Sequence, residues 1–513
     1  MPKITVNGKE VTLPEGAKVI EGFRASGEEI CHYCWHPGLS TAGVCRLCMV
    51  EIEGNPRMQI ACNTEAQEGM VVTNQSDKVK EAARFGLDFH LINHPLDCPI
   101  CDQAGECGLQ DQYMKFGKYT PEMAERKVSK HKVVDLGPTV VLDSERCILC
   151  SRCVRFTAEV SKTDELGIFN RGDRAEIGVV EGRRLDNDYS LNVVDICPVG
   201  ALTDKDFRFK QRVWYLEHAP SLCTGCSTGC SINVYYNEEG AFRVKPIENQ
   251  EVNGFWMCDR GRSIYKHLNK GERLLQAEIK KADGIESVAA GEAVKRLKET
   301  LDSVDSEKVA VVVTAQYTSE EYAAFFKYVK ETLKTQQVYY WINHRESFDD
   351  FDGLLMRGDQ NPNTKGLLDA MVESGFNLSW DDLKQKVHAG KIDTILIVGP
   401  ENQAAYPDII DRVHELAAVP RMVWFSSNPV KELLESQSET WQIPMKTFFE
   451  KEGTYVNFKG VEQKVKRGST MVVGALSLVD ISTLLSGGEV TVNNPFYTTP
   501  VKTNYFVGQR GTL

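Results

Sequence analysis

The sequence predicts a multidomain protein in which small α+β modules precede an α/β region. All 16 cysteines lie in the first 258 of the 513 residues, so the chain changes character near its middle. In the second half, short apolar runs alternate with segments of helical periodicity, a pattern typical of a largely parallel sheet. Because 42% of the residues are apolar, the chain can build several hydrophobic cores.

The N-terminal stretch "MPKITVNGKEVTL" predicts a β-hairpin, since two short strand-like runs flank an Asn-Gly pair. A signal peptide would begin with a charged segment followed by an apolar core, so we expect a cytoplasmic protein. No apolar run approaches the roughly 18 residues of a membrane span. The formal charge of -12 argues against a surface for nucleic acid.

In a reducing compartment, cysteine pairs with two intervening residues are more often metal or redox ligands than disulfides. The loop from residue 35 to residue 44 is rich in Gly, Ser, Thr and Ala, which lets backbone N–H groups approach sulfur. The first ligand set resembles a plant-type [2Fe-2S] ferredoxin loop with an altered first gap, and it consists of Cys34, Cys45, Cys48 and Cys62. A zinc site that uses Cys31 in place of Cys62 is the alternative, and otherwise Cys31 is a spare, buried thiol.

The second ligand set follows a predicted helix. "SDKVKEAARFGLDFHLINHP" favours a helix that begins near Ser76 and ends at His94, because Pro95 disfavours the helical conformation of the residue before it. We expect a [4Fe-4S] cluster, with imidazole in place of one thiolate, on His94, Cys98, Cys101 and Cys107. The alternative is a solvated His94, with Asp97, Asp102 or a remote group as the fourth ligand.

The third set predicts one [4Fe-4S] cluster in a ferredoxin-like module. Its ligands are Cys147, Cys150, Cys153 and Cys197. Two-cluster ferredoxins carry C-x2-C-x2-C-x3-C-P, and here Thr157 replaces the local fourth cysteine. The positions of a second triplet hold Asn187, Ser190 and Val193. The module therefore resembles a ferredoxin that has lost its twin cluster.

The fourth set has the spacing C-x2-C-x3-C-x27-C. It consists of Cys223, Cys226, Cys230 and Cys258. Zinc is a serious alternative for an isolated four-cysteine set. Three iron–sulfur patterns upstream favour a further [4Fe-4S] cluster.

Taken in this order, the four sets resemble the large iron–sulfur subunit of bacterial NADH:quinone oxidoreductase, respiratory complex I. The resemblance lies in the blocks "HPGLSTAGVCRLCMVE", "HPLDCPICDQAGECGLQD", "RCILCSRCVRF" and "CPVGALTDK". The fourth set resembles an extra cluster of many bacterial members. From about residue 216 the chain resembles molybdopterin oxidoreductases. That region is shorter than the family's, and no cysteine after Cys258 is present to ligate molybdenum.

The resemblance implies five domains. We expect a β-grasp [2Fe-2S] domain at 1–77, a [4Fe-4S] domain with one His and three Cys ligands at 78–137 and a ferredoxin-like [4Fe-4S] domain at 138–215. A molybdopterin-oxidoreductase-type [4Fe-4S] domain at 216–272 and a shortened, non-catalytic α/β domain at 273–513 follow. Residues 493–513 are rich in Pro, Asn, Thr and Gly and predict an extended arm that grips a partner.

The resemblance also implies an electron-relay subunit with one [2Fe-2S] and three [4Fe-4S] clusters and without molybdenum or molybdopterin. The expected partners are the NADH/FMN-binding subunit, a thioredoxin-like [2Fe-2S] subunit and quinone-side iron–sulfur subunits, with the membrane reached only through partners. This places the protein on the cytoplasmic face of a bacterial inner membrane. The alternatives are the iron–sulfur subunit of an NAD-linked formate dehydrogenase or hydrogenase, and a zinc scaffold without redox function.

Overall fold

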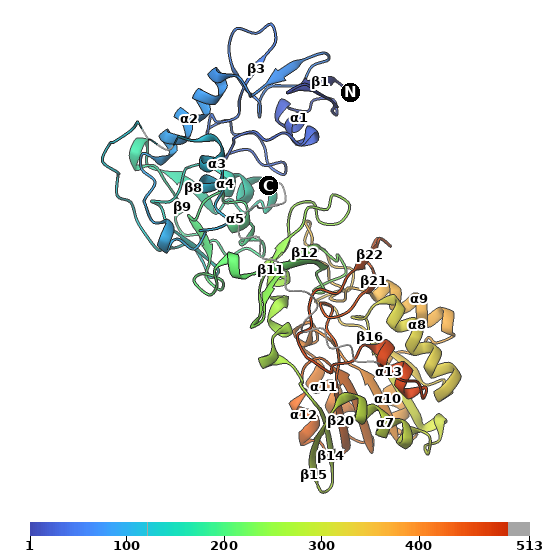
Figure 1. Ribbon diagram of the computed structural model, residues 1–513. Coiled ribbons are helices and arrows are strands. Elements are labelled where there is room, and N and C mark those ends of the chain that lie inside the picture. Colours follow the sequence, from blue (N-terminus) through green and yellow to red (C-terminus); the bar gives the residue numbers. More distant parts are fainter. Residues whose placement is uncertain (119, 121, 491–513) are drawn as a thin grey trace. The chain divides into compact units, whose positions relative to one another are not determined.

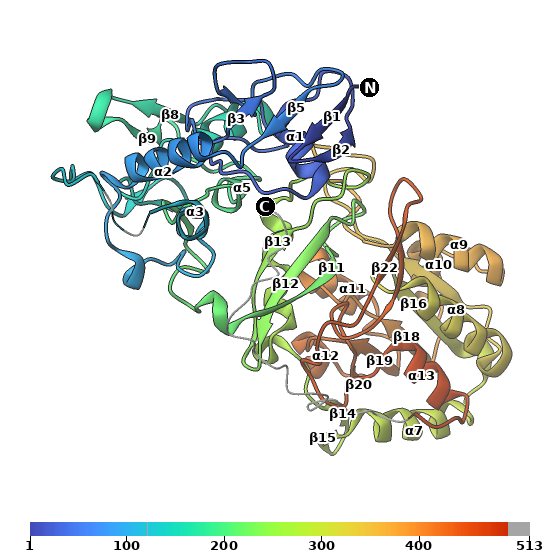
Figure 2. The same ribbon diagram turned by 45° about the horizontal axis from the view of Figure 1, so that its top comes forward.

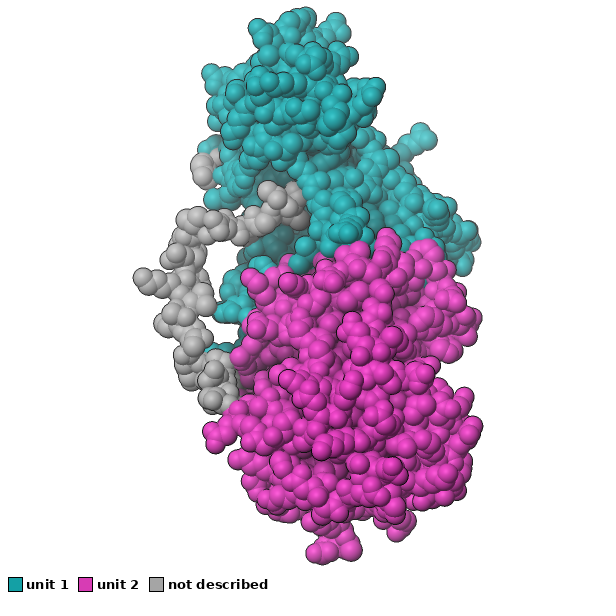
Figure 3. Space-filling model, turned by 90° about the vertical axis from the view of Figure 1, so that its right-hand side faces the viewer, with its two compact units in different colours: residues 1–218, 234–263, 352–356 teal, residues 219–233, 264–351, 357–513 magenta. Residues whose placement is uncertain are grey.

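The computed structural model describes residues 1–118, 120 and 122–490 (Figure 1). The expected C-terminal arm lies outside these residues. Two compact units share the chain, and Figure 3 colours them separately. The first unit comprises residues 1–218, 234–263 and 352–356, and the second unit holds the remaining segments.

A five-stranded sheet and one helix begin the first unit, as expected of a β-grasp module (Figure 2). The strand order is β2-β1-β5-β3-β4, in which only β1 and β5 are parallel. The predicted hairpin is confirmed, since Asn7 and Gly8 have positive φ between β1 and β2. The elements are β1 (Lys3–Val6), β2 (Lys9–Thr12), α1 (Val19–Ser26), β3 (Met49–Ile52), β4 (Gln59–Ile60) and β5 (Val71–Thr73).

The predicted helix before the second ligand set is also confirmed. α2 (Asp77–Leu91) begins after Ser76, whose side chain accepts a hydrogen bond of 3.2 Å from the backbone N–H of Val79. It ends three residues before His94 rather than at His94 itself. The ligand set itself lies between α2 and α3 (Gly108–Phe116), in a segment with only one short 3-10 turn, Cys98–Ile100.

The rest of the first unit consists of short elements around loops. A three-stranded sheet has the order β10-β7-β6, β8 pairs with β9, and a π-helical turn, Phe156–Val160, continues α4. The elements are β6 (Val134–Asp135), β7 (Val140–Leu142), α4 (Arg152–Arg155), β8 (Leu166–Phe169), β9 (Glu176–Val179), α5 (Asn192–Asp195), β10 (Leu202–Asp204) and α6 (Asp259–Arg262). A further sheet, whose residues are divided between the units, is formed by β11 (Glu217–Leu222), β12 (Ser231–Asn237) and β13 (Gly240–Pro246).

The second unit is built on a seven-stranded sheet of order β15-β14-β20-β19-β18-β16-β17. The five strands from β20 to β17 are mutually parallel, which confirms the predicted sheet, and β14 and β15 add an antiparallel edge. The strands are β14 (Ala277–Lys281), β15 (Gly284–Val288), β16 (Val309–Thr314), β17 (Val338–Trp341), β18 (Thr394–Val398), β19 (Arg421–Ser426) and β20 (Glu439–Pro444). A separate hairpin consists of β21 (Gly453–Val456) and β22 (Glu462–Val465).

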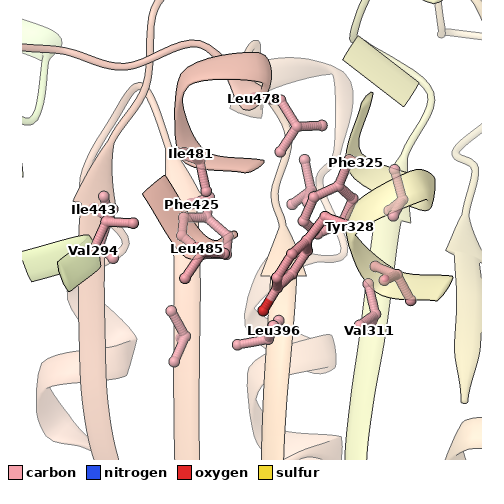
Figure 4. Packing of buried hydrophobic residues seen from close by; sticks show 14 of the residues in the cluster. Val294, Val311, Phe325, Tyr328, Leu396, Phe425, Ile443, Leu478, Ile481 and Leu485 are labelled. Carbon is pink, nitrogen blue, oxygen red and sulfur yellow. The ribbon is translucent and has the colours of Figure 1, made fainter. Parts of the chain in front are cut away.

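Helices cover both faces of this sheet, because alternate residues of its central strands enter two separate cores. Val311 packs under one set of helices, whereas its neighbour Val312 packs under the other. Figure 4 shows the first core, in which Phe325 of α8 and Ile481 of α13 lie over the strands. That face carries α7 (Ala290–Leu301), α8 (Ser319–Tyr328), α9 (Thr364–Ser374) and α13 (Leu478–Leu485). The opposite face carries α10 (Trp380–His388), α11 (Ile409–Glu415) and α12 (Lys431–Glu435).

None of the helices in the described part of the chain combines the length and the apolar composition needed to cross a bilayer.

Candidate iron–sulfur sites

Three cysteines of the first ligand set lie in the loop between α1 and β3, and the fourth, Cys62, follows β4. All four thiols are buried, and Cys34 is within hydrogen-bonding reach of Cys45 and Cys62, while Cys48 is within reach of Cys62. Hydrogen bonds from Cys45 and Cys62 lower the pKa of the Cys34 thiol. Gly43 takes a positive φ in this loop, a conformation that favours glycine. The chain therefore brings four sulfur donors together, as a small cluster needs.

Cys31 lies in a different environment from these four residues. It is buried, as expected of a spare thiol, and its Sγ donates a hydrogen bond of 2.9 Å to Oε1 of Gln112 in α3. The same amide oxygen accepts from the backbone N–H of His32, and the amide nitrogen donates to the His32 carbonyl. Gln112 thus holds Cys31 in a structural contact, which favours Cys34 as the first ligand.

His94 is half-buried, and its Nδ1 atom is buried without a hydrogen-bond partner among the described residues. Burial, with a smaller contribution from the charges of Lys127 and Arg146, lowers the pKa of His94 to about 4, although the charge of Asp97 and a backbone hydrogen bond at Arg146 oppose the shift. The imidazole is therefore neutral near pH 7, which is the form that binds metals. An unpartnered, buried and neutral ring nitrogen fits the role of a fourth ligand.

The two carboxylates that were the alternative ligands are engaged elsewhere. Asp97 forms ion pairs with Lys132 at 2.6 Å and with Arg146 at 3.0 Å. Asp102 accepts a hydrogen bond of 2.9 Å from the backbone N–H of Phe209, and burial raises its pKa. Neither carboxylate could serve as the fourth ligand without losing these contacts, which favours His94 in that role.

The three thiols of the second set differ in exposure. Cys101 is buried, Cys107 is half-buried and Cys98 is exposed. Burial raises the pKa of Cys107 most, and the charges of Cys101 and Cys98 add to it, which brings the value to about 11. The charge of Arg146 acts on both Cys101 and His94, so this guanidinium lies beside the set.

The third set forms a shared pocket in which its four cysteines join apolar side chains. The lining cysteines are Cys147, Cys150, Cys153 and Cys197. Leu149 and Ser151 take positive φ between the first three ligands, and the Leu149 N–H donates to Cys147 Sγ at 3.4 Å. Two left-handed residues without a glycine mark a strained loop, and such strain gathers at functional sites.

Polar side chains occupy most of the positions at which a two-cluster ferredoxin would hold the ligands of its second cluster. Thr157 is fully buried and donates to the Val154 carbonyl at 3.0 Å. Ser190 donates to the Asn187 carbonyl at 2.7 Å, and the Asn187 amide donates to Glu165. Hydrogen bonds to neighbouring backbone and side-chain groups thus engage Thr157, Ser190 and Asn187.

The loop after Cys197 links the third set to the second, a contact that the ligand spacing does not predict. The Pro198 carbonyl accepts from the backbone N–H of Gly108 at 2.8 Å, directly after the predicted ligand Cys107. A Cβ atom on Gly200 would collide with Cys101 Sγ. Glycine is therefore required at residue 200 by the close approach of the two loops.

The fourth set is divided between the two units. Cys223, Cys226 and Cys230 are buried in the turn between β11 and β12, where the Cys223 N–H donates to the Cys230 carbonyl at 2.8 Å. Cys258 belongs to the other unit and accepts a hydrogen bond from the Gly261 N–H at the start of α6. A joint site of these four cysteines remains a prediction.

Among the described residues, no group of three or more His, Cys, Asp or Glu side chains has the geometry to hold a single metal ion. A multinuclear cluster holds its ligands on several iron atoms rather than around one. Reasoning from the sequence also missed Gln112, Arg152 and Arg155. The two arginines could have been noticed, since they flank the predicted ligand Cys153 at helical spacing in "CSRCVRF".

Comparison with protein families finds four matching segments in the order that the ligand sets predict. Residues 2–77 match a 2Fe-2S iron-sulfur cluster binding domain, and residues 84–121 match the NADH-ubiquinone oxidoreductase-G iron-sulfur binding region. Residues 137–203 match the ferredoxin-like domain of NADH-quinone oxidoreductase subunit 3, and residues 216–270 match the molybdopterin oxidoreductase Fe4S4 domain. The chain thus carries 2Fe-2S and 4Fe-4S domains, which confirms the expected fold class.

The relatives include the G subunit of NADH-quinone oxidoreductase from Rickettsia conorii, 36% identical over 365 residues, which are 71% of this chain and 53% of the relative. The same subunit of Streptomyces coelicolor is 35% identical over 65% of this chain and 40% of its own length. The mitochondrial NADH dehydrogenase [ubiquinone] iron-sulfur protein 1 of Solanum tuberosum is 39% identical over 60% and 42%, respectively. The chain spans about half the length of these curated relatives.

One solved structure, of an NAD+-reducing [NiFe]-hydrogenase in the H2-reduced state, shares 30% sequence identity. The match covers 41% of this chain and 91% of the hydrogenase chain with a TM-score of 0.38, a similarity too low to bear on function.

Proposed function

Starting from its similarity to the G subunit of NADH-quinone oxidoreductases, we propose that this chain is an electron-relay subunit of such an enzyme. The observation that carries the proposal is the convergence of three ligand sets in one unit: four facing thiols, a set with an unpartnered imidazole nitrogen, and a pocket lined by four cysteines. Iron–sulfur clusters supply one-electron transfer when bound.

We assign one [2Fe-2S] cluster to the first set and one [4Fe-4S] cluster to each of the other three. The domain boundaries at residues 77, 137, 215 and 272 are part of the same proposal. The matched family segments support both assignments, because each contains or adjoins one ligand set. The contacts between neighbouring sets suit a relay, since electron transfer depends on how the protein holds and tunes its centres.

The proposed route enters at the first set, continues to the third and leaves through the second. NADH and flavin would bind a partner subunit, a thioredoxin-like [2Fe-2S] subunit would stand beside it, and quinone-side iron–sulfur subunits would accept the electrons. In such an assembly, which couples electron transfer to proton translocation, the chain would lie at the cytoplasmic face of a bacterial inner membrane. The names of the curated relatives favour this enzyme over a formate dehydrogenase.

For the second unit we propose a non-catalytic role without molybdopterin. Ligands of open α/β sheets bind at the carboxyl ends of the strands. There, Lys451 forms ion pairs with Glu321 at 2.9 Å and with Glu401 at 3.1 Å, and all three side chains are buried. Lys451 also lies 4.4 Å from the ring centroid of Tyr317, whose hydroxyl donates to the Gly399 carbonyl after β18. Side chains of the protein itself thus occupy this edge.

Purification of the intact complex that contains the chain, followed by EPR spectroscopy and metal analysis, tests the proposal. We expect one [2Fe-2S] signal and cubane signals on reduction by NADH. Zinc in place of iron, or a chain that purifies without flavin-containing and quinone-reactive partners, would overturn it.

A further inference from the structure

Helix α4 carries two arginines, Arg152 and Arg155, that reach from the third ligand set to the loop of the first. The helix begins shortly after the ligand Cys150 and contains the ligand Cys153. Residues three apart lie on the same face of a helix, so the two guanidinium groups leave α4 on one side. Both side chains are half-buried.

Arg155 contacts the backbone at a ligand of each set. Its Nη2 donates to the carbonyl of Cys34 and, at 3.4 Å, to the carbonyl of Cys150. Its Nη1 donates to the carbonyl of Ser40 in the same loop as Cys34. One guanidinium group therefore connects both loops through neighbouring donors.

Arg152 makes a second connection of the same kind. Its Nη2 donates to the Trp35 carbonyl at 2.6 Å, next to Cys34, and its Nη1 donates to the Ile196 carbonyl at 3.0 Å, next to Cys197. The Arg152 Nε atom is buried without a partner among the described residues. Burying an N–H donor without a partner costs free energy. The cost indicates that the guanidinium charge is kept at this position for a reason other than a hydrogen bond from this donor.

A third contact joins the loop of the first set to the π-helical turn that continues α4, and it involves neither the backbone of a proposed ligand nor a cation. Glu159 in the π-helical turn accepts a hydrogen bond of 2.8 Å from the backbone N–H of Ser40, and the Ser40 hydroxyl also donates to it. The loops therefore have a tether besides the arginines, so replacement of one arginine need not separate them.

A guanidinium group is always charged and offers donors in a rigid fork. Clusters held by thiolates are negatively charged in either redox state, and nearby positive charge and hydrogen bonds raise their potentials. A charge shared between two sets acts on both. Resting on the cluster assignments of the proposed function, we propose that Arg152 and Arg155 are positioning residues that fix the first and third centres relative to each other and raise both reduction potentials together.

The test is an EPR-monitored redox titration of the intact complex with Arg155→Gln, Arg155→Lys and the matched control Arg174→Gln, an exposed arginine elsewhere in the same module. Arg155→Gln should keep both signals but lower the potentials of the first and third centres. The expected change is about tenfold in the reduction equilibrium, or about 59 mV for a one-electron couple. The second centre should stay unchanged.

Arg155→Lys retains the positive charge but loses the paired N–H donors of the guanidinium group. Its potentials should remain near wild type, while the magnetic interaction between the two reduced centres should change, because a single ammonium cannot hold both carbonyls in the same geometry. Arg174→Gln should match the wild type in both measurements.

Unchanged potentials in Arg155→Gln would overturn the inference, as would a shift confined to one centre. Loss of all centres in both Arg155 variants would also contradict it, since the residue would then serve folding alone. If the wild-type complex lacked a [2Fe-2S] signal or the third cubane, the proposed function itself would fail. That outcome differs from normal wild-type spectra with unchanged potentials in Arg155→Gln, which would refute the inference about the arginines alone.

Discussion

At the scale of single residues, two neighbouring cysteines on one loop have different surroundings. Cys31 is bound by the side-chain amide of Gln112, whereas Cys34 faces Cys45 and Cys62. Their sequence separation is the same as that of a ligand pair, so spacing alone left both as candidates. The hydrogen-bond partner distinguishes the structural thiol from the proposed ligand.

We predict that Cys31→Ala leaves the [2Fe-2S] signal intact and that Cys34→Ala abolishes it. Removal of the Cys31 thiol leaves Gln112 without one donor, whereas Cys34 would be one of four ligands. EPR spectra of the reduced protein, with iron content measured on the same samples, provide the comparison. The opposite pattern would assign the cluster to Cys31.

A second prediction at this scale concerns His94, whose Nδ1 atom is buried and unpartnered within the described residues. His94→Cys should retain a cubane at a lower potential, because thiolate adds a negative charge to the site. His94→Ala should make this cluster labile and spare the other centres. Quinone reduction by NADH should fall, while reduction of an artificial acceptor at the flavin persists. An unchanged cluster in His94→Ala would show that His94 is not a ligand and would favour the alternative of a solvated histidine.

At the scale of elements, the loop 197–200 serves two ligand sets at once. Cys197 lines the pocket of the third ligand set, and Gly200 packs against Cys101 of the second set. A Cβ atom there would also lie 2.9 Å from Gln103 Cβ. A side chain can therefore be added at residue 200 only if residues of the second set move.

Gly200→Ala should destabilise the second centre more than the third. Overpacking of a close contact costs about 1–3 kcal/mol, and here the strain falls on the Cys101 side chain. The rate of cluster loss in the presence of a chelator, followed by EPR, measures the effect. Gly271→Ala is the control, because its added Cβ has nothing within 4 Å. Equal cluster lifetimes in both variants would contradict the proposed strain.

In the second unit, the buried cation Lys451 lies between Glu321 and Glu401. Burial alone would lower the pKa of Lys451, but the two carboxylates outweigh it and raise the pKa above its usual value. A group whose pKa is raised on folding stabilises the folded state below its unfolded pKa of about 10.5 and loses this contribution as the pH rises through the folded value.

Lys451→Met should therefore lower the free energy of unfolding by about 3–5 kcal/mol near neutral pH, because it leaves buried carboxylates without their counter-ion. The difference from wild type should persist up to about pH 10 and shrink as the pH rises through the folded-state pKa of Lys451. Denaturant unfolding at several pH values measures it. Adding Glu321→Gln to the variant should recover part of the loss, and no recovery would argue against the ion pair as the cause.

At the scale of the whole molecule, the sequence predicted what depends on local spacing. The hairpin at Asn7, the helix after Ser76 and the parallel sheet all follow from neighbouring residues, and the structure contains them. The ligand triplets within one loop follow from the same kind of spacing and stay a prediction. The end of α2 was predicted three residues too late, since the bias from Pro95 sets a limit for the helix rather than its last residue.

The contacts between ligand sets were beyond such prediction. Arg155 and Cys34 are 121 residues apart, and Gln112 and Cys31 are 81 residues apart. The periodicity of the sequence does not predict which loops contact each other, because these contacts depend on how separate modules pack. For the same reason, the sequence predicts donors for each set but not the arginines that connect two sets.

The most direct test of the account is the metal content and EPR redox titration of the full chain in its complex. We expect about 14 iron atoms per chain, from one [2Fe-2S] and three [4Fe-4S] clusters, and no stoichiometric molybdenum or tungsten. All four centres should be reducible, and those on the proposed route should be reduced by NADH. Stoichiometric zinc with little iron, or recovery of molybdenum with the chain, would contradict the relay function.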